Sequence, residues 1–257
     1  MTGPARAVAT PTRSLIAAHR GGAALWPENS LTAFRGALEL GVDLVELDVH
    51  LTADGEVVVI HDPTLRRTTT GRGALRRRTF SSLGVERLRG TPDESVPRLR
   101  DVLELVRPTA AGLLVEIKVG RARRRYPGIE AAVLTRLAAA GLVGRATVMG
   151  FEWDTLARLR AHSAAIRLTG LLTRRSALRR GGVAAAARRA AALGATDLGI
   201  ERTLLSARTV RAARVAGLSV GVWTVNDPDE ILRALALGVD YVTTDRPDLA
   251  LRLRETA

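Results

Sequence analysis

The chain has 257 residues, 46% of them hydrophobic and none a cysteine, a composition that predicts a large core and excludes disulfide scaffolds, thiolate nucleophiles and cysteine-ligated zinc. The formal net charge is +13, but every basic residue except Lys118 is an arginine and only 3% of the residues are aromatic, which indicates coding bias rather than a platform for stacking bases. We expect no specific nucleic-acid partner; the charge favours small anionic substrates and leaves a weak association with anionic membranes open.

Residues 1–14 are predicted to form a flexible tail, followed by a single domain over residues 15–257. The tail, MTGPARAVATPTRS, lacks the apolar stretch of a secretory signal peptide. No apolar run in the chain approaches the roughly 18 residues that a membrane-spanning helix needs. We therefore expect a soluble, cytoplasmic protein.

From residue 15 onward, short apolar runs alternate with Ala/Leu/Arg stretches of helical period, the pattern of repeated βα units around a parallel sheet. The predicted strands cover residues 15–19, 44–49, 57–61, 113–118, 146–151, 168–172, 197–201, 220–225 and 241–245. The predicted helices include residues 30–40, 128–140, 183–192, 207–215 and 228–237. A glycine follows each of these helices, where a left-handed cap favours it.

The second and third predicted strands are joined by a segment that is too short for the helical crossover between parallel strands. Asp54-Gly55 within it suits a two-residue hairpin turn. Centring the hairpin on this turn places Asp48 opposite His61, with both side chains on one face. Without the returning arm, eight strands remain, and eight strands with intervening helices predict a closed (β/α)₈ TIM barrel.

Residues 62–98 interrupt the alternation of predicted strands and helices, and they are predicted to form a small insertion at the C-terminal face of the barrel. The segment contains nine arginines and four acidic residues. A solvated loop and a lid or substrate-guiding surface explain it equally well.

Three acidic residues close predicted strands, at the end of the barrel where active sites of this fold lie. Glu46 and Asp48 share one face of their strand because side chains alternate, and Glu116 closes the next parallel strand. Three carboxylates at one mouth repel one another unless a cation lies between them. Oxygen ligands suit magnesium or calcium better than zinc, so we predict one divalent cation, Mg²⁺ or Ca²⁺, on these residues.

Two histidines and two cationic residues also close predicted strands. His19 and His61 suit general acid and base catalysis because imidazole titrates near neutral pH. Arg20 and Lys118 suit binding of an anionic substrate. The combination predicts a phosphoryl-transfer site.

Other polar residues near these strand ends allow more than one interpretation. Asp62 either orients His61 through a hydrogen bond or caps the turn that follows it. Asn226 either belongs to the pocket or caps the following helix. We interpret His50 and His162 as structural residues.

These residues lie in motifs that resemble the glycerophosphodiester phosphodiesterase family. The matching segments are AHRGGAALWPENSLTAF at 18–34, DLVELDVHLTADGEVVVIHDPTLRRTTTGRG at 43–73, VPRLRDVLELV at 96–106, VEIK at 115–118, VWTVND at 222–227 and GVDYVTTDRPD at 238–248. They extend over nearly the whole chain after the tail, and their combination is highly specific. The resemblance implies a metal-dependent hydrolase that splits a glycerophosphodiester into sn-glycerol 3-phosphate and an alcohol.

The resemblance implies the same roles for the residues named above: an acid–base pair, metal ligands and phosphate contacts. It adds Trp223 as an aromatic residue that lines the substrate pocket, whereas the sequence alone fits a core tryptophan equally well. Two alternatives stay open. The same site serves a lysophospholipase D that acts on membrane lipids, or the barrel binds phosphate or nucleic acid without catalysis. The sequence does not predict the oligomeric state.

Overall fold

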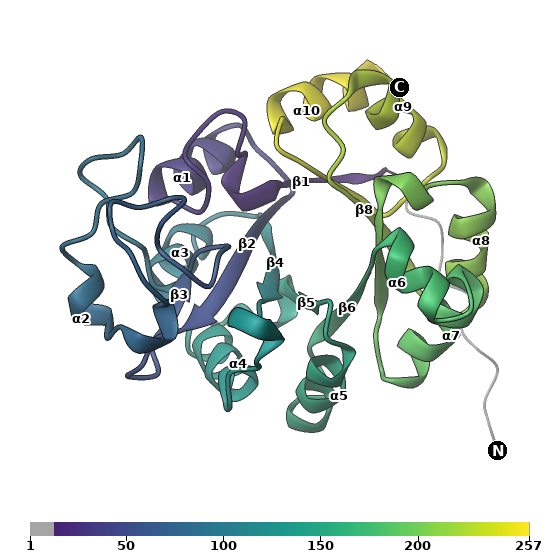
Figure 1. Cartoon of the computed structure of the whole chain (residues 1–257). Helices are drawn as coiled ribbons and strands as arrows, with labels where there is room; N and C mark the ends of the chain where they lie inside the picture. The colour runs from purple at the N-terminus through teal and green to yellow at the C-terminus, as the bar shows by residue number, and fades with distance from the viewer. Residues whose placement is uncertain (1–12, 257) are drawn as a thin grey trace.

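The computed structural model describes residues 13–256, so residues 1–12 of the predicted tail lie outside the described residues. Eight parallel strands with intervening helices close into a barrel, viewed along its axis in Figure 1. In the order in which they pair, the strands are β1 (Leu15–Ala18), β9 (Tyr241–Thr244), β8 (Ser219–Trp223), β7 (Asp197–Glu201), β6 (Arg167–Leu172), β5 (Ala146–Gly150), β4 (Gly112–Ile117) and β2 (Leu44–Leu51), and β2 pairs with β1 to close the ring. The predicted (β/α)₈ TIM barrel is confirmed.

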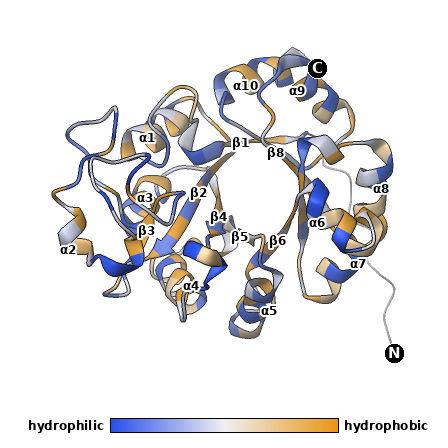
Figure 2. Cartoon of the chain, in the orientation of Figure 1, coloured by the Kyte–Doolittle hydropathy of each residue, from blue (hydrophilic) through white to orange (hydrophobic). Residues whose placement is uncertain are grey.

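Helices surround the barrel and present one side to the strands, and each carries both hydrophobic and hydrophilic residues (Figure 2). They are α1 (Leu31–Glu39), α3 (Leu99–Val106), α4 (Ile129–Ala139), α5 (Trp153–His162), α6 (Arg174–Arg179), α7 (Val183–Ala192), α8 (Ala207–Val215), α9 (Pro228–Ala236) and α10 (Pro247–Thr256). The five helices and nine strands predicted from periodicity are present with ends within two residues of the predicted ones. Among residues 13–256 there is no helix whose length and hydropathy would let it span a membrane.

The strand β3 (Val57–Val59) pairs antiparallel with the C-terminal end of β2, but its register differs from the predicted one. The pairs Val49–Val59 and Leu51–Val57 show that the hairpin is shifted by one residue. The physical reason lies at the turn, where Thr52 pairs with Glu56 through its backbone and hydroxyl, leaving the three residues 53–55 in the loop. The prediction of a two-residue turn with Asp48 opposite His61 is therefore wrong.

Residues 62–98 pack beside β3, outside the ring of strands (Figure 1). They contain one turn of 3₁₀ helix (Leu75–Arg77) and the short α2 (Phe80–Leu83). Their apolar side chains form a cluster of their own with two residues of the hairpin arm; the fully buried members are Val58, Ile60, Leu65, Leu75, Leu83, Leu88 and Val96. The segment is a packed unit rather than a solvated loop.

Side chains from several strands pack together inside the barrel, among them Ala17, Leu114, Met149, Leu171 and Tyr241. Tyr241 lies fully inside and its hydroxyl is 3.3 Å from the Thr169 hydroxyl. Gly221 on the adjacent β8 makes room for this ring, because a Cβ atom there would lie 2.0 Å from the Tyr241 ring. The functional side chains lie above this ring, at the C-terminal ends of the strands.

Candidate active site

His19 follows β1 and is held by a carboxylate from the neighbouring strand end. Its Nδ1 donates to Asp245 Oδ1 at 2.6 Å, and Asp245 is held in turn by Asn226, whose side-chain amide donates to Oδ2 at 2.7 Å. Burial lowers the pKa of His19, but the hydrogen bond with Asp245 and the negative charge of Glu46 outweigh burial and raise it above its ordinary value. The imidazole is therefore oriented, with Nδ1 occupied and Nε2 left for other partners.

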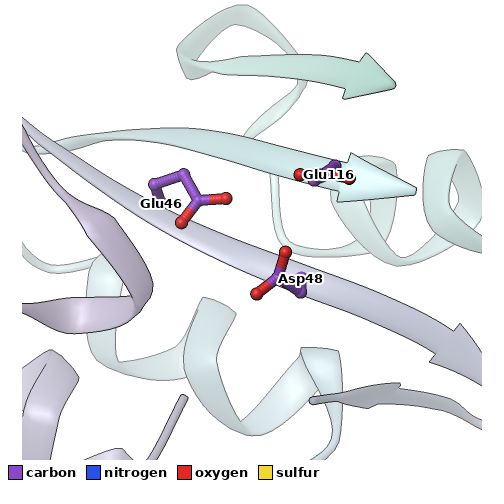
Figure 3. A group of neighbouring side chains, drawn as sticks. All are labelled: Glu46, Asp48 and Glu116. Carbon is purple, nitrogen blue, oxygen red and sulfur yellow. The ribbon is translucent and has the colours of Figure 1, made fainter. Parts of the chain in front are cut away.

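Three buried carboxylates lie together on two neighbouring strands (Figure 3). Glu46 and Asp48 project from β2, and Glu116 is the register partner of Asp48 on β4. One carboxylate oxygen from each residue lies within 4.8 Å of the other two. The parallel pairing of β2 with β4 thus brings the three predicted metal ligands to one point.

The electrostatics of these three carboxylates fit a bound cation. Burial and the charge of Asp48 raise the pKa of Glu46 to about 8, and burial likewise raises the pKa of Glu116. Lys118 and Arg20 outweigh burial at Asp48 and lower its pKa. Among the described residues, the buried Oδ1 of Asp48 accepts no hydrogen bond. The donor set consists of oxygens, one of them without a hydrogen bond, and the neighbouring carboxylates repel one another. These properties fit a divalent hard cation.

Two cationic side chains lie beside the three carboxylates. Lys118 Nζ lies 2.8 Å from Glu116 Oε1 and 3.4 Å from Asp48 Oδ1. Arg20 Nε lies 3.2 Å from Asp48 Oδ2, and its Nη1 donates to Glu28 at 3.0 Å. Although burial opposes it, these carboxylates raise the pKa of Lys118 above its ordinary value. Both residues therefore carry positive charge beside the site.

His61 reaches the site from the hairpin arm, although it does not lie opposite Asp48. Its Nδ1 donates to Asp62 Oδ1 at 2.7 Å, so Asp62 orients the imidazole. Beneath it, His50 Nε2 donates to the His61 carbonyl oxygen at 3.0 Å, and the Tyr126 hydroxyl lies 2.9 Å from His50 Nδ1. His50 supports the backbone that carries His61 and has no place in the cavity lining, in keeping with its interpretation as a structural residue.

A cavity of about 140 Å³ opens among these side chains. It is polar on one side and apolar on the other, and is lined by His19, Arg20, Glu46, His61, Glu116, Lys118, Met149, Phe151, Leu171, Trp223, Thr224, Tyr241 and Thr243. Trp223 belongs to the apolar side, where its indole nitrogen donates to the Gly199 carbonyl at 3.0 Å and its ring meets Phe151 edge to face. Asp48 lies behind this lining, in contact with Lys118 and Arg20.

Several residues that hold the site were not assigned from the sequence. Asn29 donates to Asp48 Oδ2 at 2.9 Å, and Asp245 holds His19. Asn226 does not cap α9, because the side chain of Asp227 accepts the hydrogen bonds from that helix start. Each of these residues stands within a motif or at a strand end, and that position was the available signal.

Comparisons with known proteins agree with this geometry. The family model described as "Glycerophosphoryl diester phosphodiesterase family" matches residues 19–249. A glycerophosphodiester phosphodiesterase from Bacillus altitudinis is 33% identical over 252 residues, which cover 93% of this chain and 98% of that protein. A crystal structure of a protein from Agrobacterium tumefaciens, described as a "Putative glycerophosphoryl diester phosphodiesterase", is 30% identical and has a TM-score of 0.90. The match covers 95% of this chain and 98% of that chain.

A second solved structure was determined with a bound product. It is a phosphodiesterase from Oleispira antarctica in complex with the product sn-glycerol-3-phosphate; it is 25% identical, has a TM-score of 0.81, and the match covers 95% of this chain and 97% of that one. The family model, the Bacillus altitudinis relative and both solved structures extend over nearly the full chain, as the sequence motifs do. The chain belongs to the glycerophosphoryl diester phosphodiesterase family.

Proposed function

We propose that the protein hydrolyses glycerophosphodiesters to sn-glycerol 3-phosphate and an alcohol. The observation that carries this proposal is the convergence, on one cavity, of two oriented imidazoles, a buried carboxylate group and two cationic side chains. The product named for the Oleispira relative supports the choice of substrate class. The substrate of this chain is then a small diester that enters the mouth of the barrel.

Glu46, Asp48 and Glu116 would hold one divalent cation, Mg²⁺ or Ca²⁺. When bound, such an ion supplies positive charge that polarises the phosphoryl oxygens. Arg20 and Lys118 stand beside the carboxylates, and they bind the phosphate group through charge-assisted hydrogen bonds. Their charges also stabilise the additional negative charge that develops in the transition state.

His19 and His61 carry the proton transfers. Each ring has its Nδ1 bonded to a carboxylate, Asp245 or Asp62, so Nε2 is the atom that exchanges a proton with the substrate. One imidazole takes a proton from the nucleophile, and the other gives a proton to the departing alkoxide. The nucleophile is water or the substrate's own 2-hydroxyl; only the second route forms a cyclic phosphate, which rapid quenching detects.

The apolar side of the cavity holds the carbon skeleton of the substrate. Trp223 and Phe151 offer ring faces and edges there, and the cavity lining around them has no acidic side chain. Trp223 is therefore assigned to the substrate pocket.

The experiment that tests this function is a panel of glycerophosphodiesters incubated with the purified protein and Mg²⁺, Ca²⁺ or EDTA. We expect release of sn-glycerol 3-phosphate with at least one metal and loss of release in EDTA, restored by adding metal back. Faster turnover of lysophospholipid vesicles than of glycerophosphocholine would instead favour a lysophospholipase D. No release from any diester would contradict the proposed function.

A further inference from the structure

Arg67 joins two carboxylates just outside the cavity. Its Nε and Nη2 donate to the two oxygens of Asp62 at 2.8 and 3.1 Å. Its Nη1 and Nη2 donate to the two oxygens of Glu28 at 2.6 and 2.7 Å. One planar guanidinium thus forms two forked contacts, a geometry that a lysine cannot reproduce.

Each of the two carboxylates also holds a residue that lines the cavity. Asp62 Oδ1 accepts from His61 Nδ1, and Glu28 Oε1 accepts from Arg20 Nη1 at 3.0 Å. A continuous chain of hydrogen bonds therefore runs from His61 to Arg20, with Arg67 at its centre. Arg67 itself does not line the cavity.

Arg67 fixes the direction of both carboxylates through its forked contacts and also favours their ionised forms. Its hydrogen bond is the largest influence on Asp62 and lowers the pKa of that carboxyl to about 2, against the opposing effect of burial. An ionised carboxylate only accepts hydrogen bonds, and the contact with Arg67 holds Asp62 with Oδ1 towards the ring of His61. In this position Asp62 fixes the proton of His61 on Nδ1 and leaves Nε2 free. Burial at Glu28 is likewise outweighed by Arg67 and Arg20, which lower its pKa.

We propose that Arg67 is a positioning residue that fixes both the tautomer of His61, through Asp62, and the direction of Arg20, through Glu28. This inference rests on the proposed function, because it assigns a consequence for turnover to residues of that site. The Arg67 side chain is 45% exposed, so its removal leaves no cavity in the core and changes stability little.

The test compares Arg67→Ala and Arg67→Lys with Arg66→Ala, assayed for kcat and KM with glycerophosphocholine and metal. Arg66 is the matched control, because it is the adjacent exposed arginine and forms no hydrogen bond or ion pair with any described residue. Loss of a residue that orients a functional group typically lowers activity by about 10- to 100-fold. We expect Arg67→Ala to fall in this range with unchanged thermal stability, Arg67→Lys to recover only part of the loss, and Arg66→Ala to match the wild type.

A double-substitution background separates positioning from a general effect on the fold. In the Asp62→Asn, Glu28→Gln protein the two carboxylates can no longer act as ionised acceptors. If Arg67 acts through them, adding Arg67→Ala to this background costs far less activity than it does in the wild type. An equal further loss in both backgrounds would overturn the inference.

A spectroscopic measurement tests the same inference without turnover. The chain has four histidines, so the ring ¹⁵N signals of His61 can be assigned with a His61→Gln sample. We expect a single Nδ1–H tautomer in the wild type and in Arg66→Ala, and a mixture in Arg67→Ala. An unchanged tautomer in Arg67→Ala overturns the inference. If the wild type releases no glycerol 3-phosphate, the proposed function fails, and this spectrum still decides whether Arg67 positions His61.

Discussion

His50 shows how a buried residue next to the candidate site can govern stability. Both ring nitrogens have partners: Nε2 donates to the His61 carbonyl, so it carries a proton, and Nδ1 of the neutral ring can accept from the Tyr126 hydroxyl. Burial lowers the pKa of His50 from 6.5 to about 4. The folded protein therefore resists protonation that the unfolded chain accepts.

We predict that His50 makes the protein less stable as the pH falls from 6.5 towards 4. In this range the unfolded chain binds a proton that the folded chain does not, so the free energy of unfolding falls, by up to about 3 kcal/mol, and levels off below pH 4. Urea unfolding of the wild type and His50→Gln at pH 7 and pH 4 measures this effect. Glutamine keeps a donor for the His61 carbonyl but does not titrate, so parallel losses of stability in the two proteins would contradict the prediction.

The residues that close strands could be found from the sequence, and so could Asp62 beside His61, whereas the partner of His19 could not. His19, Glu46 and Glu116 each end an apolar run, and the fold requires such ends to meet. Asp245 lies 226 positions from His19 in the chain, and only the closure of β9 against β1 makes them neighbours. The pairing of two residues at this separation is set by the geometry of the ring, and the local sequence does not indicate which residues become partners.

At the scale of elements, the segment 62–98 is tied to the barrel through the start of α1. The Glu94 carboxylate accepts from the backbone N–H groups of Leu31 and Thr32 at 2.8 and 3.0 Å, and also from the Thr32 hydroxyl. Ser30, the residue that directly precedes the same helix, caps it by accepting a hydrogen bond from the Ala33 N–H at 2.9 Å. The negative charge of Glu94 also interacts favourably with the positive end of the helix dipole.

We predict that Glu94→Gln lowers the free energy of unfolding by about 1 kcal/mol, the usual effect of losing a side-chain acceptor and a negative charge at a helix start. Asp93→Asn is the matched control: it removes the same charge from the adjacent exposed residue, for which no side-chain hydrogen bond or ion pair is found within the described part of the chain. Urea unfolding midpoints compare the three proteins. Equal effects of the two substitutions would show that Glu94 acts through net charge alone.

The loop length and register of the hairpin could not be predicted from the local sequence. Asp54-Gly55 predicted a turn in the correct place, but the hydrogen bonds of Thr52 with Glu56 fix a loop one residue longer. In a sheet, a shift of one residue turns a side chain to the opposite face. His61 nevertheless reaches the cavity because β3 ends at Val59 and the chain leaves the sheet before His61.

At the scale of the whole molecule, the closed barrel could be predicted because the apolar runs alternate with segments of helical period and a glycine follows each of the five predicted helices. Gly41 and Gly238, for example, have the positive φ angles of 76° and 65° that left-handed caps adopt. The apolar side of the cavity could not be predicted in the same way. Met149, Phe151 and Leu171 differ in no visible way from core residues until the ring of strands is closed.

The central claim is that two imidazoles on one cavity carry the proton transfers, and the most direct measurement is kcat for release of sn-glycerol 3-phosphate by His19→Ala and His61→Ala. General acid or base assistance is worth about 10²- to 10⁴-fold, so each substitution should lower kcat by at least about 10²-fold. His162→Ala, an exposed histidine on α5 that does not line the cavity, serves as the control and should keep wild-type turnover. Wild-type turnover in His19→Ala and His61→Ala would contradict the account.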